Sequence, residues 1–307
     1  MARPEITETV VRTPGGKIAC TTAGPDDAPA LLLVHGLGAT RRTWRKLIGA
    51  LATDHRVIAA DLPGHGDSEE PSGDYSLGAH ATALRDVLTV LDVPAVTIVG
   101  HSLGGGIALQ FAYQFPERTQ RGVLISSGGL GPEVNLMLRA ATLPGAETVV
   151  AQLARIPEGV TRRVLPLMSM LPRFLALEDA GPTAGTLHGL SDPRSRVAFV
   201  RTAQSVINWR GQTVSALKRL HLLAGMPVMI AWGANDQTIP PDHHRAFAQL
   251  VPTATVAEIP DAGHFLHETA ADRLLPPLLD FLATEPPFEY SEERWRRLLT
   301  GDHSSVD

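Results

Sequence analysis

Short, nearly unbroken runs of hydrophobic residues recur along this chain, separated by longer stretches of mixed polarity. Five runs share this character: Leu31–Val34, Val57–Ala60, Val96–Val99, Val123–Ile125 and Val228–Ala231. Runs of this length with so few polar residues are typical of strands that are buried on both faces of a parallel sheet. We therefore expect these five segments to form the middle of one sheet.

The segments around these strands predict how the sheet is connected. Residues 80–91 carry apolar side chains at helical spacing, and a helix between two buried strands makes a βαβ unit. Near the N-terminus, Glu8–Thr13 and Lys17–Thr22 flank a Pro-Gly-Gly turn and predict an antiparallel hairpin. The expected fold class is α/β, with a doubly wound, mostly parallel sheet.

Residues 131–220 break the alternation of strand and helix. Their pattern predicts no buried strand and four short helices, at Glu133–Ala141, Glu147–Ala154, Arg162–Met170 and Pro193–Ile207. Helices inserted here would cover the strand ends, where open α/β sheets bind ligands. We therefore predict an inserted helical cap at 131–220, called the cap segment below. The sheet core is predicted at 1–130 and 221–284, and a C-terminal extension with a surface helix at 285–307.

Composition narrows the class of protein. With 44% hydrophobic and 19% charged residues, the 307-residue chain can build a sizeable core, and its interspersed charges with a net of −5 argue against a nucleic-acid partner. No segment is long and apolar enough to span a membrane, and the N-terminus lacks the apolar run of a signal peptide, so we expect a cytoplasmic protein. The single cysteine, Cys20, is expected to be buried and structural. The oligomeric state is not predicted.

The strongest chemical signal is the segment Gly100-His101-Ser102-Leu103-Gly104, directly after a buried strand and before a helix-like stretch. A sharp strand-to-helix turn exposes the serine hydroxyl beside free backbone N–H groups at a helix N-terminus. Side chains at positions 100 and 104 would collide with neighbouring strands, which explains the two glycines. A chance pentapeptide in a glycine-rich loop is the alternative, but the strand–turn–helix setting favours Ser102 as a nucleophile.

A base and an acid follow the last two predicted strands. His264 lies on the loop after the β-prone run Thr255–Ile259, and Asp236 follows the run that begins at Val228. His267 is a second histidine close by, which we expect to begin the next helix and point away. Asp242 is interpreted as a helix N-cap, and Asp261 lies too near His264 to orient it. Ser102, Asp236 and His264 are therefore the candidate catalytic triad.

Five motifs together resemble the α/β-hydrolase superfamily over about residues 8–284. They are His35-Gly36, Asp61–Ser68, Gly100–Gly104, Gly233–Asp236 and Gly263–Phe265. The order serine, aspartate, histidine along the chain is that of this architecture. Three further segments are similar to a group of actinobacterial members that mostly lack assigned substrates: Ser126–Gly131, Asn208–Gln212 and Ala216–Leu220.

The resemblance implies an oxyanion hole and a set of supporting residues. The backbone N–H groups of Leu37 and Leu103 would stabilise the oxyanion. His35 is expected to brace its loop. The supporting motif comprises His35, Gly36, Gly100, His101 and Gly104. No Cys/His cluster or phosphate-binding loop is present in the sequence, so neither a metal nor an organic cofactor is expected.

The implied activity is hydrolysis of a carboxylic ester or lactone through an acyl-enzyme. The many Leu, Val and Met residues of the cap segment favour a small to medium-sized, largely apolar substrate over a polar one, although side chains at this spacing also suit the interior of the cap. Haloalkane dehalogenases and epoxide hydrolases of this fold carry aspartate at the position of Ser102, which argues against those activities. Meta-cleavage product C–C hydrolases usually have Asn before the nucleophile and Trp after the histidine, where this chain has His101 and Phe265. C–C hydrolysis is thus the alternative, and a non-catalytic ligand-binding protein is the third. Four cap arginines could bind a substrate carboxylate, with solvated helix charge as the simpler interpretation: Arg194, Arg196, Arg201 and Arg210.

Overall fold

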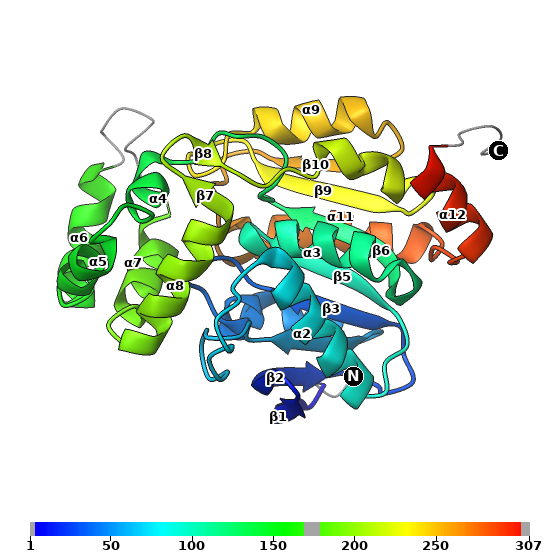
Figure 1. Cartoon of the computed structure of the whole chain (residues 1–307), viewed down its shortest axis with the longest axis horizontal. Helices are drawn as coiled ribbons and strands as arrows, with labels where there is room; N and C mark the ends of the chain where they lie inside the picture. Colours follow the sequence, from blue (N-terminus) through cyan, green and yellow to red (C-terminus); the bar gives the residue numbers. More distant parts are fainter. Residues whose placement is uncertain (1–3, 169–178, 302–307) are drawn as a thin grey trace.

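The computed structural model describes residues 4–168 and 179–301. Its centre is an eight-stranded sheet with the strand order β1-β2-β4-β3-β5-β6-β9-β10 (Figure 1). The strands are β1 Ile6–Thr13, β2 Gly16–Ala23, β3 Ala30–Val34, β4 Arg56–Ala60, β5 Val96–His101, β6 Thr119–Ile125, β9 Val228–Gly233 and β10 Thr255–Ile259. Strands β1 and β2 form the predicted antiparallel hairpin, β2 also pairs antiparallel with β4, and all other pairs are parallel. The predicted α/β class is confirmed.

Helices cover both faces of the sheet, which explains why the central strands are apolar throughout. Alternate residues of β3 point to opposite sides: Leu32 and Val34 join the cluster with α2 and α3, whereas Leu31 and Leu33 join the one with α1 and α11. The helices of the sheet core are α1 Arg45–Leu51, α2 Leu77–Val90, α3 Leu103–Gln114, α9 Asp242–Leu250, α10 Leu266–Thr269 and α11 Ala271–Thr284. Both faces of β3 are therefore dry, as a continuous hydrophobic run requires.

The cap segment forms short helices, which stand beyond one end of the sheet in Figure 1. They are α4 Leu136–Ala140, α5 Ala146–Leu153, α6 Glu158–Met168, α7 Ala180–Gly189 and α8 Pro193–Val206. The α8 prediction is correct to within one residue because the Asp192 side chain caps the helix, and Pro193 occupies its first turn. Met170, the predicted end of the third helix, lies outside the described residues. The predicted division into core, cap and extension stays a prediction.

Two features of the cap segment differ from the prediction. Helix α7 was missed because its sequence, AGPTAGTLHG, has three glycines, a proline and no apolar periodicity. A small antiparallel ladder also occurs here, between β7 Ile207–Asn208 and β8 Gly211–Gln212. Two residues on each side are too few to produce an alternating sequence pattern.

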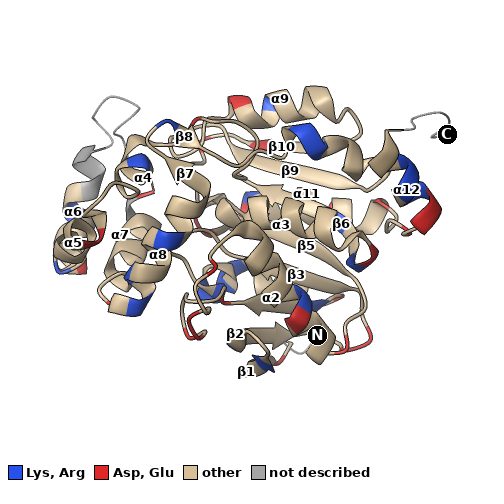
Figure 2. Cartoon of the chain, viewed as in Figure 1, with Lys and Arg blue, Asp and Glu red and all other residues tan. Residues whose placement is uncertain are grey.

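The structure also bears on the predictions for the C-terminal tail, for Cys20, for the distribution of charge and for membrane spans. The charged tail forms α12 Glu292–Thr300, which contacts the sheet core through a hydrogen bond from Arg294 Nη2 to the Ala224 carbonyl, 3.1 Å. Cys20 is fully buried in β2, and burial raises its pKa to about 12. Figure 2 shows basic and acidic residues interspersed along the helices. No helix of the described ranges is long and apolar enough to cross a membrane.

Candidate active site

Ser102 occupies a strained turn between β5 and α3. Its φ of 54° and ψ of −117° lie in a region that residues other than glycine rarely adopt. Four hydrogen bonds hold the turn. The Ser102 N–H donates to the Ile125 carbonyl at 2.9 Å, and the Ser102 carbonyl accepts from Gly128 at 2.9 Å, Gly105 at 3.0 Å and Gly106 at 3.4 Å. A Cβ atom on Gly104 would collide with the Val34 carbonyl oxygen. Neighbouring segments of the same chain therefore hold the turn in this conformation and leave room only for glycine at position 104.

His264 and Asp236 meet at the carboxyl ends of β10 and β9. His264 Nδ1 lies 2.8 Å from Asp236 Oδ2, and both side chains are buried. The other carboxylate oxygen, Oδ1, accepts from the backbone N–H groups of Thr238 at 2.8 Å and Ile239 at 2.9 Å. Because a carboxylate accepts, Nδ1 carries the proton and Nε2 keeps its lone pair. The pair thus presents a histidine whose second nitrogen is a base.

Ser102 stands at the same edge of the sheet, after β5. The ring of His101, its neighbour in the chain, lies 4.8 Å from the His264 ring, centroid to centroid. Within residues 4–168 and 179–301, no hydrogen bond joins Ser102 directly to His264. His264 and Asp236 are therefore joined by a direct hydrogen bond, whereas the serine turn contacts this pair through the ring of His101.

The loop after β3 lies against the Ser102 turn. A Cβ atom on Gly36 would be 3.2 Å from the Ser102 Cβ. Neither the Leu37 N–H nor the Leu103 N–H donates to an acceptor within the part of the chain that the structure describes. The geometry leaves both predicted oxyanion donors available.

His35 holds this loop in place. Its Nδ1 donates to the Gly36 carbonyl at 2.8 Å, and its Nε2 accepts from the Leu62 N–H at 2.9 Å. The Gly36 carbonyl and the Leu37 N–H belong to one planar peptide, so a bond to the first orients the second. Burial lowers the pKa of His35 to about 4, which keeps the ring neutral. This arrangement agrees with the expected loop brace.

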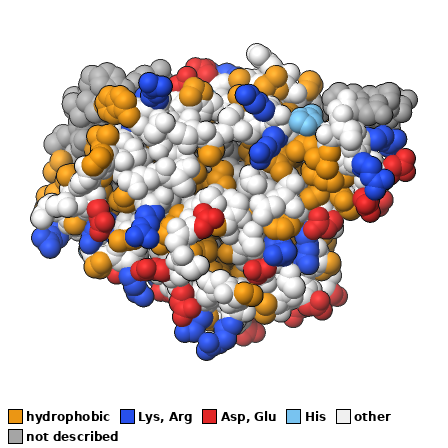
Figure 3. Space-filling view, in the orientation of Figure 1, with side chains coloured by type: hydrophobic (Ala, Val, Ile, Leu, Met, Phe, Trp, Pro, Cys, Tyr) orange, Lys and Arg blue, Asp and Glu red, His pale blue; other side chains and the backbone are white. Residues whose placement is uncertain are grey.

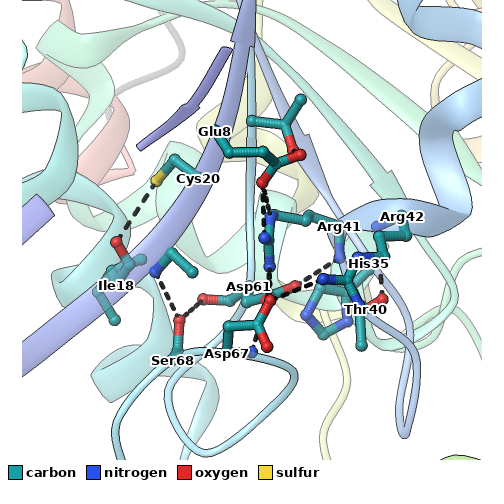
Figure 4. A network of polar contacts seen from close by, with 12 residues as sticks. Glu8, Ile18, Cys20, His35, Thr40, Arg41, Arg42, Asp61, Asp67 and Ser68 are labelled. Atoms are coloured by element: carbon teal, nitrogen blue, oxygen red, sulfur yellow. Dashed lines mark hydrogen bonds and ion pairs between the residues drawn. The ribbon is translucent and has the colours of Figure 1, made fainter. Parts of the chain in front are cut away.

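Behind the loop, the buried Arg41 is the centre of an ion cluster that the sequence analysis did not identify. Its backbone N–H donates to Asp61 Oδ1 at 2.6 Å, and its guanidinium bonds Asp61, Glu8 and Asp67 (Figure 4). Burial raises the pKa of Asp61, opposed by the hydrogen bonds that it accepts from Arg41 and Asp67. Asp61 belonged to a quoted motif, but nothing in the pattern around Arg41 marks it as the partner.

The prediction that His267 points away from the site is wrong. Its side chain packs beneath the site. Its ring centroid lies 4.1 Å from that of His101, and its Nε2 bonds Thr43 Oγ1 at 2.7 Å. Burial lowers the pKa of His267 to about 3, and it lowers that of His101 well below its usual value. Both rings are therefore neutral supports. His101 Nε2 donates to the His264 carbonyl at 3.0 Å, because a carbonyl oxygen can only accept.

A second residue missed by the sequence analysis comes from the cap segment. Asp179, just before α7, accepts a hydrogen bond from the Phe265 N–H at 2.8 Å through Oδ2. It thus touches the loop that carries His264. Its short-range context, between residues outside the description and a glycine-rich helix, offers no motif that could have revealed it.

The alternative acid Asp242 and two of the cap arginines make contacts outside the Ser102, His264 and Asp236 group. Asp242 begins α9 without capping it, contrary to the prediction, and pairs with Arg245 at 3.0 Å. Arg196 donates to the Leu190 carbonyl at 3.0 Å, and the Arg201 guanidinium carbon lies 5.9 Å from the centroid of the Tyr75 ring. No group of three or more potential metal ligands occurs among the described residues.

Comparison with known proteins places this site in a family. Residues 29–271 match the family described as the alpha/beta hydrolase fold. An uncharacterized protein of Mycobacterium tuberculosis is 39% identical over 279 residues, covering 88% of this chain and 80% of its own length. A magnesium-chelatase 30 kDa subunit of Rhodobacter capsulatus is 33% identical over 267 residues, covering 84% and 88%.

Solved structures agree on the fold. A 2-hydroxy-6-oxo-6-phenylhexa-2,4-dienoate hydrolase from Rhodococcus sp. strain RHA1 superposes with a TM-score of 0.74 at 22% identity, covering 92% of this chain and all of the other. Further structures with this fold include meta-cleavage product hydrolases, a lipase and an esterase. With a strained serine, a histidine–aspartate pair and this match over most of its length, the chain belongs to the α/β-hydrolase fold family.

Proposed function

We propose that this chain is a serine hydrolase that cleaves a carboxylic ester or lactone of a small to medium-sized, largely apolar substrate. The observation that carries the proposal is the 2.8 Å bond between His264 Nδ1 and Asp236, at the sheet edge where Ser102 is held at a φ of 54°. A buried histidine with a free Nε2 serves as a general base, and a strained, presented serine serves as its nucleophile.

The mechanism is acyl transfer in two steps. His264 Nε2 takes the hydroxyl proton as Ser102 Oγ bonds to the substrate carbonyl carbon, and then gives the proton to the departing alcohol oxygen. Water, deprotonated by the same nitrogen, attacks the acyl-enzyme, and the proton returns to Ser102 as the acid is released. Asp236 holds the tautomer and stabilises the imidazolium. The Leu37 and Leu103 N–H groups bind the oxyanion, and losing one such donor costs about 100- to 1,000-fold in rate.

Apolar packing beside the proposed oxyanion hole supports the substrate class. The Leu37 side chain packs against two groups of buried apolar residues. One is the cluster between the sheet and helices α2 and α3, and the other, called the cap cluster, lies within the cap segment. A Cβ atom on Gly38 would lie 2.9 Å from the Thr186 methyl and 3.0 Å from the Phe199 ring, so α7 and α8 cover this loop directly. An apolar group next to the reacting carbonyl would meet an apolar wall here.

C–C hydrolysis of a meta-cleavage-type acid is the second candidate. The structural similarity to such a hydrolase favours it. Asp179 opposes it, because a partly buried carboxylate against the His264 loop would repel a substrate carboxylate. The ester or lactone therefore remains the main proposal.

The test is a substrate panel with wild type and Ser102→Ala. The panel contains p-nitrophenyl esters of increasing chain length, several lactones and one meta-cleavage-type acid. We expect the wild type to prefer a neutral ester or lactone, and Ser102→Ala to lose about 10⁴-fold or more in kcat. Covalent labelling by a fluorophosphonate should disappear in the same variant. Preference for the acid would support the second candidate.

Ser126→Ala is the matched control. Ser126 is also a buried serine at a strand end, and its hydroxyl has no hydrogen-bond partner within the described ranges, so its removal should leave kcat within a few-fold. Ester turnover by Ser102→Ala at the wild-type rate would refute the proposed mechanism. Binding of the panel compounds without product release would instead favour a non-catalytic protein.

A further inference from the structure

The peptide that joins His264 to Phe265 is held at both of its polar atoms. Its carbonyl, on His264, accepts from His101 Nε2 at 3.0 Å. Its N–H, on Phe265, donates to Asp179 Oδ2 at 2.8 Å. His101 belongs to the serine turn, whereas Asp179 comes from the cap segment. One peptide plane, which contains the Cα atom that carries the proposed base, is thus fixed from two different parts of the chain.

Asp179 makes this contact instead of a local one. It occupies the N-cap position of α7, where an aspartate usually accepts from the backbone of its own helix, yet its side chain makes no capping bond. By contrast, Asp192 caps α8 by accepting from Arg194 and Ser195, both at 3.4 Å. The stabilisation that a cap would contribute to α7 is forgone in favour of the His264 loop.

The surroundings of Asp179 are built around its carboxylate. A Cβ atom on Gly263 would lie 2.6 Å from Oδ2 and 3.0 Å from the carboxyl carbon, so a side chain at 263 would displace the acid. Burial raises the pKa of Asp179, opposed by the hydrogen bond from Phe265 and by the nearby His264. No lysine or arginine pairs with it in the part of the chain described, and the other charged group that faces it is Asp236.

We infer that Asp179 is a positioning residue, through which the cap segment holds the His264–Phe265 peptide and thereby aligns the His264 ring between Asp236 and Ser102. The inference rests on the function proposed above. Rotation of this peptide would turn the Cα–Cβ bond of His264, and a displacement of 1 Å in a catalytic group costs about 100-fold in rate. The contact also makes the alignment of the base depend on the cap being seated.

Three variants separate this role from simple support of the fold. Asp179→Ala removes the acceptor. Asp179→Asn retains a carbonyl oxygen that can accept from Phe265, but removes the charge. Asp192→Ala is the matched control, because it removes an aspartate from the neighbouring cap helix without touching the His264 loop.

The first measurement is hydrogen exchange of the backbone amides on the His264 loop, which does not depend on catalysis. Asp179→Ala should accelerate exchange of the Phe265 amide by about tenfold or more, whereas Asp179→Asn and Asp192→Ala should leave it near the wild-type rate. Unchanged exchange in Asp179→Ala overturns the inference, whatever the enzyme does.

The second measurement is steady-state kinetics on the preferred ester, with the rate of fluorophosphonate labelling at Ser102. Asp179→Ala should lower kcat and the labelling rate by about 10- to 100-fold with KM within about threefold, and Asp179→Asn should restore most of both. Equal losses in Asp179→Ala and Asp192→Ala, or no rescue by asparagine, overturn the positioning role. A wild type that is not labelled at Ser102 refutes the proposed function, while amide exchange still decides whether Asp179 holds the loop.

Discussion

The sheet core and the cap segment bury their side chains to very different degrees. Every residue of β3, β5 and β9 is buried, and two large hydrophobic clusters fill the two faces of the sheet. Among the described residues, the cap cluster has six buried members: Ala141, Val150, Ala154, Leu190, Phe199 and Val200. In Figure 3, hydrophobic side chains reach the surface at the cap end of the molecule. Val149 is 59% and Val164 48% exposed there.

This difference separates two tasks. The sheet core must hold catalytic atoms to within a fraction of an ångström, and dense packing around a sheet edge does so. The cap segment contributes apolar surface and one partly buried acid, Asp179, at the rim of the site. Short helices with few buried contacts tolerate changes of sequence that would disrupt the core. Substitutions that fill space should therefore have opposite effects in the two regions.

The largest effect is expected for Gly104→Ala in the core. The added Cβ would collide with the backbone carbonyl oxygens of Val34 and His35, which cannot move without disturbing the sheet. We expect the free energy of unfolding to fall by about 3 kcal/mol or more, measured by chemical denaturation.

Gly106→Ala, two residues along the same helix, is the control for this experiment. Its nearest neighbours would be 3.6 Å or more from the new methyl group, which is ordinary van der Waals contact. It should leave stability unchanged or slightly raised. Equal losses in both variants would mean that the close approach of α3 to β3 is not the cause.

An intermediate effect is expected from lowering the pH, and it comes from the core. Burial lowers the pKa of five histidines there most strongly: His35 to about 4, His65, His80 and His267 to about 3, and His101 well below its usual value. Their unfolded pKa is higher, so the unfolded chain binds more protons between about pH 4 and 6.5. The contribution of these histidines to stability is therefore fully present above pH 6.5. It is lost as the pH is lowered, by up to about 1.4 kcal/mol per pH unit for each histidine.

His80→Leu tests this slope at one residue. Neither ring nitrogen of His80 has a hydrogen-bond partner within the described ranges, so the replacement sacrifices no such bond. Urea denaturation at several values between pH 7.5 and 5 should show a slope smaller than that of the wild type by about one proton. An identical slope in the two proteins would contradict the assignment of His80 as a buried, neutral group.

The smallest effect is expected in the cap segment, for Gly185→Ala in the middle of α7. A methyl group there would meet no atom within 4 Å. Alanine favours a helix over glycine by about 0.8–1.0 kcal/mol, so stability should rise by up to that amount, measured by denaturation followed by circular dichroism. A decrease would show that α7 needs the glycine for a contact beyond its own helix.

Predictions from the sequence succeeded where a feature is local. The five apolar runs became the central parallel strands, because burial on both faces leaves a continuous hydrophobic signature. The segment Gly100–Gly104 became a strained turn, because its glycines and its place between strand and helix are all contained in five residues. Asp192-Pro193 began a helix for the same reason. Helix α7 shows the limit, because a glycine-rich helix at the edge of the cap has no amphipathic pattern.

The sequence by itself therefore determined the fold class, the serine turn and the order in which serine, aspartate and histidine follow their strands. Only the tertiary structure decided what supports them. Arg41 binds Asp61 across 20 residues, and Asp179 binds the Phe265 amide across 86. Such contacts pair residues whose own neighbours in the chain show no periodicity or motif. They arise when the packing of helices on the sheet takes an acid, base or N–H away from water so that it must find a partner, and the sequence does not state which partner it meets.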